Sequence, residues 1–420
     1  MPEFLTLLPP DEARDLMLSH LPKPEPASEP IDVPFALNRI LAEDIHANQP
    51  LPDFQRTTVD GYAVRAGDTH GASDSLPAYL TLIGEVPMGD APVFDIGPGQ
   101  CALIHTGGML PGGADAVVML EYTQAIGRDE PHGRPEIEIL RAVADGENVI
   151  RIGEDVAQGQ LVLPKGTLIR PAEIGGLMAL GITSLRVVKK ALVGLISTGD
   201  EVVDPSQTPR PGQVRDINSY TLGALVEKSG GAAKRYGIIR DQFQALKEAA
   251  AEALSECDVV IITAGSSAST RDMTADVIRS LGEPGVLVHG INTRPGKPTI
   301  LGVCNGRAMI GLPGNPVSAL VNGYLFVVPV IERLLGALPR PKATVMTRLT
   351  VNLPSQAGRE DWWPVKLIEN RKSEIASYDA DPIFGKSNLI FTLAAAHGLL
   401  RIHPDATGLS AGEIVEVFLF

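Results

Sequence analysis

The order of apolar and polar positions divides the chain into regions with different expected structure. Residues 11–20 carry apolar side chains at helical spacing after Pro9 and Pro10, which predicts an N-terminal helix. Between about residues 32 and 150, short apolar runs are broken by Gly and Pro, which predicts a β-rich region with little helix. After Pro341 an alternating pattern continues to the C-terminus and predicts a small β-barrel or sandwich.

The region between these two parts alternates strands with helices. Short apolar runs of buried-strand type occur at 192–196, 258–262 and 308–310. The helical patterns lie at 219–229, 242–256, 274–281 and 317–335, and the last should kink at Pro329. This alternation predicts a parallel sheet covered by helices on both faces.

Length and charge narrow the class of protein. A chain of 420 residues exceeds one ordinary core, so two to four domains are expected. The net charge of −14, without a long Lys/Arg run, argues against nucleic acid or a membrane surface as a partner. Three dispersed cysteines indicate a reducing compartment. The N-terminus has no secretory pattern and the most apolar stretch, 324–331, is too short to span a bilayer, so we expect a cytoplasmic protein.

The segment 308–318 predicts the end of a buried strand, a tight loop and the start of a helix. Asn315 suits an N-cap, and Pro316 suits the first helical position. Gly314 lets the backbone approach a ligand. Free N–H groups and the helix dipole would then favour an anion. Taken alone, an ordinary strand-to-helix turn explains the segment somewhat better.

Two further loops follow predicted strands of the same sheet. The first holds Ser197, Thr198, Gly199, Asp200 and Glu201, and the second is hydroxyl-rich, with Ser266 and Ser267, and ends at Asp272. Ligands of parallel sheets bind beyond the carboxyl ends of the strands. Three unusual loops at one edge therefore favour a binding site over simple helix capping.

A basic segment lies between the second and third loops. Arg294 offers a planar fork and Lys297 a point charge for an oxyanion, on a segment stiffened by prolines. A phosphate-binding P-loop is excluded, because Ile291 and Pro298 stand where Gly and Ser/Thr are required. A solvated basic turn is the alternative.

Four acids fall near the same edge. A hard cation such as Mg²⁺, bound through carboxylates and substrate phosphates, would reconcile these acids with an anionic ligand. For Asp241 alone, capping of the following helix is the simpler explanation. The four acids are Asp200, Glu201, Asp241 and Asp272.

Several segments together resemble the molybdopterin molybdenumtransferase family, which includes the E domain of gephyrin. They occur in family order over nearly the whole chain. The matching segments are TVDGYA at 58–63, IHTGG at 104–108, STGDE at 197–201, GIIRD at 237–241, RPGKP at 294–298 and GLPGNPVS at 311–318.

The resemblance implies a fold class of α/β plus β in a homodimer of four-domain protomers. The active site would lie between the α/β domain of one subunit and the inserted β-rich domain of the other. The implied domains are an N-terminal linker and dimerisation domain (1–31 and 146–190), the inserted β-rich domain (32–145), the central parallel-sheet molybdopterin-binding domain (191–338) and a C-terminal β-barrel (339–420).

The implied reaction inserts molybdate into adenylylated molybdopterin, with Mg²⁺-dependent release of AMP. By the resemblance, Asp60 joins Glu201, Asp241 and Asp272 as functional acids, and the last three are the candidate metal ligands. We add Lys297 for oxyanion binding. The implied substrate contacts are Thr106, Pro313 and Pro316, with Arg359 and Ser387 near molybdate. An upstream adenylyltransferase and acceptor molybdoenzymes are the implied partners.

Departures from the family pattern leave alternatives open, and in the last domain the segments 362–364 (Trp-Trp-Pro) and 386–388 (Lys-Ser-Asn) diverge further. The usual GGVSVG loop is AGSSAS at 264–269, and the usual Lys-Pro-Gly-Lys-Pro has Arg294 in its first position. The alternatives are a tungstate-preferring paralogue and a non-catalytic molybdopterin carrier or scaffold.

Overall fold

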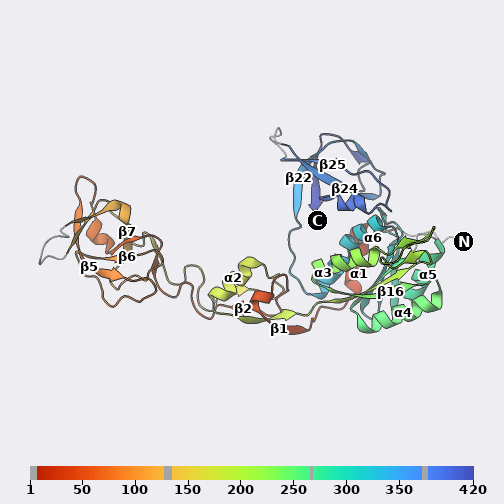
Figure 1. The fold of residues 1–420 in the computed structure, drawn as a ribbon, viewed down its shortest axis with the longest axis horizontal. Coiled ribbons are helices and arrows are strands. Elements are labelled where there is room, and N and C mark those ends of the chain that lie inside the picture. Colours follow the sequence, from red (N-terminus) through yellow and green to blue (C-terminus); the bar gives the residue numbers. More distant parts are fainter. Residues whose placement is uncertain (1–6, 127–134, 265–267, 371–376) are drawn as a thin grey trace.

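The computed structural model describes residues 7–126, 135–264, 268–370 and 377–420, except for the side chains of 268–272. The chain is elongated (Figure 1). A β-rich domain lies at one end, and a thin middle segment that carries helix α2 (Pro171–Ala179) connects it to the α/β domain and a β-barrel at the other end.

The β-rich domain is a six-stranded sheet in the order β7-β4-β6-β5-β9-β8. Tyr62, Leu80 and Ile137 pack in its core. In its described residues, 57–126 and 135–148, the only helical structure is two 3₁₀ turns, so the β-rich expectation agrees with the structure. The elements are β4 (Gly61–Val64), η2 (Ala66–Thr69), β5 (Ala78–Val86), β6 (Gln100–Ile104), β7 (Ala116–Met119), η3 (Leu120–Tyr122), β8 (Thr123–Ile126) and β9 (Glu136–Ile139).

Three short antiparallel pairs build the middle segment, beside the 3₁₀ turn η1 (Val33–Phe35). Because these pairs belong to the middle segment, they favour boundaries of the inserted β-rich domain near residues 56 and 149 rather than at 32 and 145. The pairs are β1 (Ser28–Asp32) with β12 (Ser184–Val188), β2 (Ile45–His46) with β11 (Leu161–Leu163), and β3 (Arg56–Thr57) with β10 (Val149–Ile150).

Helix α1 (Pro10–His20) forms at the predicted N-terminal position. Its buried Ala13 and Met17 belong to the same core cluster as Leu301 and Val330 of the α/β domain, and α1 packs against the elements that carry these two residues. These contacts favour placing α1 in the α/β domain rather than in the linker domain.

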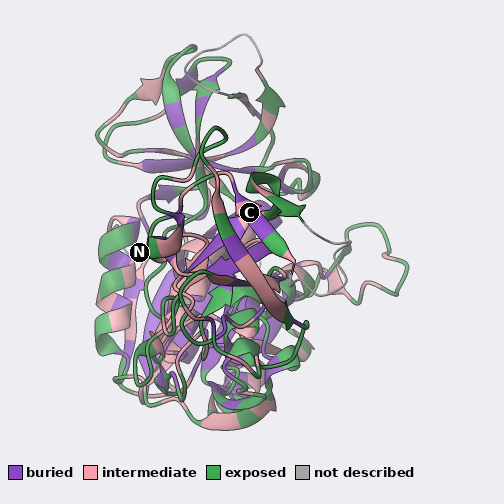
Figure 2. Ribbon diagram, turned by 90° about the vertical axis from the view of Figure 1, so that its left-hand side faces the viewer, coloured by how far each residue is buried: buried purple, intermediate pink, exposed green. Residues whose placement is uncertain are grey.

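The α/β domain has one six-stranded sheet in the order β16-β13-β17-β21-β20-β18. The first four strands are parallel, and β20 and β18 add an antiparallel edge to the expected parallel sheet. In Figure 2 the central strands are mostly buried. The strands are β13 (Leu192–Thr198), β16 (Ala232–Ile239), β17 (Val259–Ala264), β18 (Pro284–His289), β20 (Ile300–Cys304) and β21 (Arg307–Pro313), and the small pair β14 (Val202–Val203) with β15 (Val214–Arg215) lies outside the sheet.

Alternate residues of β17 point to opposite faces of this sheet. Val259 and Ile261 belong to one core cluster, with α1, α3 (Asn218–Lys228) and the helices that follow β21. Val260 and Ile262 belong to the other, with α4 (Phe243–Glu256) and α5 (Ala268–Arg279). Helices therefore cover both faces, as the sequence predicts. Helix α5 begins at Ala268 rather than Thr274, so the predicted loop at 263–272 ends in helix.

The long C-terminal helical run of this domain contains a π-helical turn. Helix α6 (Pro316–Asn322) continues through η4 (Gly323–Val327) into α7 (Val328–Leu334). The turn precedes Pro329, which cannot donate the usual backbone bond to Leu325, so the helix departs from α geometry next to the position of the predicted kink. Residues 316–334 are apolar and long enough to cross a membrane by composition alone, but 56% of that window is buried inside the protein, as in a core helix.

The C-terminal domain is a closed barrel because its strands follow the order β24-β25-β22-β28-β26 and β26 pairs back with β24, which confirms the predicted β-barrel. The strand β19 (Thr293–Arg294) of the α/β domain adds to β24 and joins the two domains. The remaining elements are β22 (Thr344–Leu349), β23 (Leu353–Pro354), β24 (Glu360–Glu369), β25 (Tyr378–Pro382), α8 (Phe391–Ala394), β26 (Gly398–Ile402), β27 (Gly408–Leu409) and β28 (Ile414–Leu419).

Candidate active site

The three predicted loops leave the sheet at one edge. Strands β13, β17 and β21 are neighbours and run parallel. Ser197 lies opposite Thr263, and Thr263 lies opposite Leu312, so the loops after these residues start side by side. Sequence reasoning placed this edge correctly, because buried parallel strands give uninterrupted apolar runs.

The hydroxyl of Ser197 already has a partner in the protein. It donates to Asp216 at 2.9 Å, and Ser219 Oγ donates to the same carboxylate at 2.5 Å. Asp216 is only 7% exposed, and no sequence pattern had singled it out. Thr198 Oγ1, by contrast, is buried and makes no hydrogen bond of normal geometry, but it lies close enough to Asp241 to offset in part the rise that burial causes in the pKa of that carboxyl. Of these two hydroxyls, that of Thr198 is the freer to meet a ligand.

An acidic cluster forms where β13 and its neighbour β16 end. Gly199 has φ +138°, a backbone conformation that residues with a side chain rarely adopt, so this turn favours glycine. Burial, followed by the negative charges of Asp200 and Glu201, raises the pKa of Asp241. Gln242, not Asp241, is the N-cap residue of α4, so helix capping does not account for Asp241.

The carboxylates of this cluster are the donor type that Mg²⁺ prefers. Asp241 Oδ1 is buried without a hydrogen-bond partner and lies among acids. Where side chains are described, no group of three or more His, Cys, Asp or Glu side chains could hold a metal. Mg²⁺ commonly takes one or two carboxylates and completes its shell with phosphate oxygens and water, so the cluster fits such an ion. Ser266, Ser267 and the Asp272 side chain lie outside the described part of the chain.

The loop between β21 and α6 is held by contacts from other elements. Asn218 Nδ2 donates to the Gly314 carbonyl at 2.8 Å. Asn315 stands at the N-cap position and Pro316 follows at the first helical position, as predicted, but the Asn315 side chain makes no capping bond. The Val317 N–H donates to the Ser387 carbonyl of the barrel at 3.0 Å. This helix start therefore offers fewer free N–H groups to an anion than the sequence indicates.

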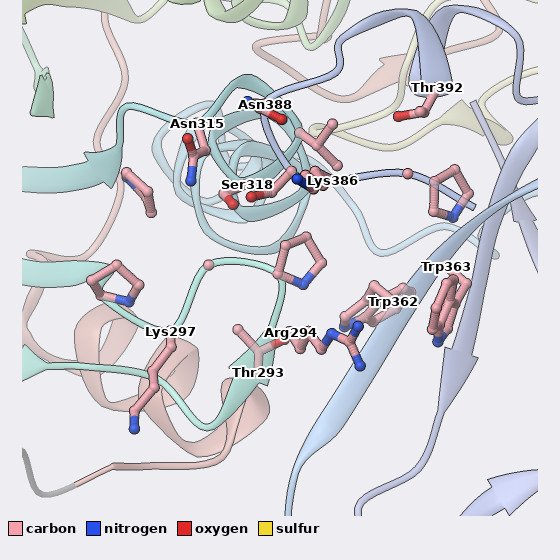
Figure 3. Close-up of a pocket in the computed structure, with 18 of the residues that line it drawn as sticks. Thr293, Arg294, Lys297, Asn315, Ser318, Trp362, Trp363, Lys386, Asn388 and Thr392 are labelled. Carbon is pink, nitrogen blue, oxygen red and sulfur yellow. The ribbon is translucent and has the colours of Figure 1, made fainter. Parts of the chain in front are cut away.

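A pocket of about 730 Å³ lies between the α/β domain and the barrel (Figure 3). Four cationic side chains line it, and none of its lining residues is acidic. The lining includes the predicted residues Arg294, Lys297, Pro313, Asn315, Arg359 and Ser387, and also Trp362, Trp363 and Lys386, for which the sequence indicated no role.

Arg294 and Lys297 leave their loop in different directions (Figure 3). Arg294 extends toward the two tryptophans, and its guanidinium carbon lies 5.3 Å from the centre of the Trp363 ring. Lys297 extends to the other side of the loop. The two cations therefore do not act as one pair.

Asp60 and Thr106 form a separate site on the β-rich domain. Asp60 Oδ1 accepts hydrogen bonds from the Thr106 N–H at 2.7 Å and from Thr106 Oγ1 at 3.1 Å. These bonds lower the pKa of Asp60. Within one chain this domain lies at the far end of the molecule from the α/β sheet (Figure 1), so a single chain does not bring the two sites together.

Three family models match the chain. They are the MoeA N-terminal region (domain I and II) at residues 8–181, a probable molybdopterin binding domain at 194–333 and the MoeA C-terminal region (domain IV) at 347–420. The chain belongs to the MoeA family. The strand-end edge lies in the region that matches the molybdopterin binding domain. The cationic pocket lies where this region meets the part that matches the MoeA C-terminal region.

Similar proteins match the MoeA-family chain over its whole length. The molybdopterin molybdenumtransferase of Bacillus subtilis is 32% identical over 100% of this chain and 95% of its own length. That of Haemophilus influenzae is 33% identical over 97% of each chain. A crystal structure of a molybdopterin biosynthesis MoeA protein from Pyrococcus horikoshii OT3 is 34% identical, with a TM-score of 0.84 over 99% of this chain and 100% of that one.

Proposed function

We propose that the chain inserts molybdate into adenylylated molybdopterin, with Mg²⁺-dependent release of AMP, and so produces molybdenum cofactor. One observation carries this proposal: a single strand-end edge has an acidic cluster at one end and a cationic pocket at the other. The relatives named molybdopterin molybdenumtransferase support the transfer of molybdenum in this reaction.

The spacing of the edge fits a two-ended substrate. The acids follow β16 and β13, and the pocket begins after β21, two strands away from β13. Neighbouring strands lie about 4.8 Å apart, which separates the ends of β13 and β21 by about 10 Å. A molecule with phosphates at one end and a dithiolene at the other could contact both ends.

At the acidic end we assign metal binding to Glu201, Asp241 and Asp272. A bound Mg²⁺ would neutralise phosphate charge and polarise the bond to AMP. Thr198, Gly199 and Asp200 would line the phosphate side, together with Ser197, whose hydroxyl is held by Asp216. Ser266 and Ser267 complete the proposed substrate loop.

At the cationic end the chemistry consists of positioning and charge stabilisation. Arg294, Lys297 and Arg359 would offset the repulsion between molybdate and the other anionic groups, and Ser387 would contact the oxyanion. The wall of the pterin site would be formed by Pro313, Gly314, Asn315 and Pro316.

The catalytic unit would be a homodimer in the cytoplasm. Asp60 and Thr106 lie far from the edge in their own chain, so a second chain would bring them to it. The upstream adenylyltransferase and the acceptor molybdoenzymes would be its partners.

The direct test supplies the purified protein with adenylylated molybdopterin, Mg²⁺ and molybdate. We expect AMP release together with metal insertion. Tight pterin binding without AMP release would establish the carrier alternative instead. A repeat with tungstate decides whether the chain is the tungstate-preferring paralogue.

A further inference from the structure

A buried carboxylate lies behind the cationic wall of the pocket. Asp361 on β24 has no exposed surface, and it is absent from the residues that line the cavity. Its negative charge partly cancels the positive charge that faces the cavity. A buried acid at this place should weaken the attraction of anions, so its presence needs another explanation.

Asp361 binds two arginines that do line the pocket. Arg359 makes two parallel bonds to it, Nε to Oδ1 at 2.7 Å and Nη2 to Oδ2 at 3.0 Å. Arg294 Nη1 lies 3.7 Å from Oδ2. This arrangement fixes the plane of the Arg359 guanidinium, because a two-bond fork permits only one orientation.

The contact to Arg294 crosses the boundary between two domains. Arg294 and Asp361 are also backbone partners in the pairing of β19 with β24. The Arg294 guanidinium also lies over the ring of Trp363. One carboxylate therefore holds one cation from the α/β domain and one from the barrel.

We propose that Asp361 is a positioning residue that makes the pocket selective for tetrahedral dianions of the molybdate class by fixing Arg294 and Arg359. The proposal rests on the proposed function, since it takes the oxyanion substrate from there. Fixed donors bind a tetrahedral anion better than mobile ones, because no reorganisation is needed on binding. The negative charge of Asp361 has the opposite effect, because it weakens the attraction of anions to the pocket. Replacing Asp361 therefore changes molybdate affinity in opposite directions through these two effects.

Tryptophan fluorescence reports on this pocket alone. The chain has two tryptophans, Trp362 and Trp363, and both line the cavity. Titration with molybdate measures oxyanion affinity. Quenching by iodide measures the attraction of an anion that needs no directed hydrogen bonds.

The decisive variant is Asp361→Asn, which removes the charge and keeps the shape. We expect its Kd for molybdate to rise about tenfold or more, because misplaced groups lose affinity steeply, while iodide quenching stays equal or increases. A variant that binds molybdate as tightly as the parent protein, or more tightly, would show that Asp361 only neutralises charge and would overturn the proposal.

The control is Asp379→Asn on the same barrel. Asp379 also pairs with an arginine, Arg348, at 3.0 and 3.2 Å, but neither residue lines the pocket. We expect both titrations to match those of the parent protein. A loss of molybdate affinity as large as that of Asp361→Asn would mean that any broken barrel ion pair has this effect, and it would refute a specific role.

If Asp361→Asn fails to fold, Arg359→Lys provides the test. Lysine keeps the charge but cannot form the two parallel bonds. Weaker molybdate binding with unchanged iodide quenching is the result that the proposal requires of its fixed fork, and unchanged molybdate binding overturns the proposal. Absence of molybdate binding by the parent protein also overturns it. Molybdate binding without AMP release refutes the proposed function alone.

Discussion

Arg401 and Glu360 form an ion pair at 2.5 Å in the seam between the barrel and the rest of the protein. Glu360 is 2% exposed and also accepts a bond from Trp362 Nε1 at 2.7 Å. Arg401 extends on to Asp11 of α1 at 3.0 Å. The N-terminal helix, the barrel and a tryptophan of the pocket are therefore joined through one guanidinium.

Arg401→Met should destabilise the docked barrel. Removing one partner leaves the Glu360 carboxylate buried without its counter-charge, which costs about 3 kcal/mol. Unfolding in urea, followed by tryptophan fluorescence, measures the loss. The matched control is Arg14→Met, which breaks an exposed pair with the same Asp11 and should cost less than about 1 kcal/mol. Equal losses in the two variants would contradict a special role of the seam.

Asp241→Asn should increase stability at neutral pH while it lowers turnover. The pKa of Asp241 is raised in the folded chain, so its contribution to stability is present at low pH and is lost as the pH rises through that pKa. An amide removes this cost. We expect a higher Tm at pH 7, by a few degrees, and a difference that shrinks toward about pH 4.

Asp204→Asn is the control for this pH effect. Ser206 holds the pKa of Asp204 below its ordinary value, so ionised Asp204 is favourable and its amide should give no gain in Tm at neutral pH. A Tm of Asp241→Asn that is equal to or below that of the parent protein would show that Asp241 carries no cost in the folded state.

Gly296→Ala should disrupt the loop that carries Arg294 and Lys297. A Cβ at Gly296 would lie 1.7 Å from Asn322 Nδ2, at φ +104°. Asn322 could not then keep its bond to the Pro295 carbonyl, at 3.2 Å. We expect a loss of molybdate affinity and a lower Tm.

Gly212→Ala is the control that separates the cost of backbone strain from the cost of the contact with Asn322. Gly212 also has a positive φ, +89°, but a Cβ added there would have no atom within 4 Å. Its cost should be the conformational strain alone, about 1–3 kcal/mol, without a change in molybdate binding. If the two variants lose equal stability, the contact with Asn322 does not constrain the loop.

The sequence predicted the strand-end edge well and the pocket only in part. The runs of β13, β17 and β21 are visible because both faces of each strand are buried. Strands β18 and β20 did not stand out, since Gly285 and Gly302 interrupt their apolar character. The early start of α5 is hidden by Ser269 and Thr270, which have low helix propensity.

The pocket depends on contacts that leave no local pattern. Trp363 contacts Arg294 of the two-residue strand β19, which is too short to show a periodicity, and Lys386 lines the same pocket. Asp361 pairs with Arg359 only two residues earlier, but its second partner, Arg294, is far away in the chain, so the link between the two cations leaves no local signal. Residues of this kind become visible only when the two domains are placed together.

Mixed dimers test whether two chains share one active site. In the proposed dimer, Asp60 of one subunit and Asp241 of the other belong to the same active site. A dimer of one Asp60→Asn chain and one Asp241→Asn chain then has one intact site and one site with both substitutions. We expect about half of the parental AMP release per dimer, whereas each variant alone should be nearly inactive. Differently tagged subunits, purified through both tags, establish the composition. Verified mixed dimers without recovered activity would place Asp60 outside the shared site, since its amide variant keeps the shape of the side chain that meets Thr106.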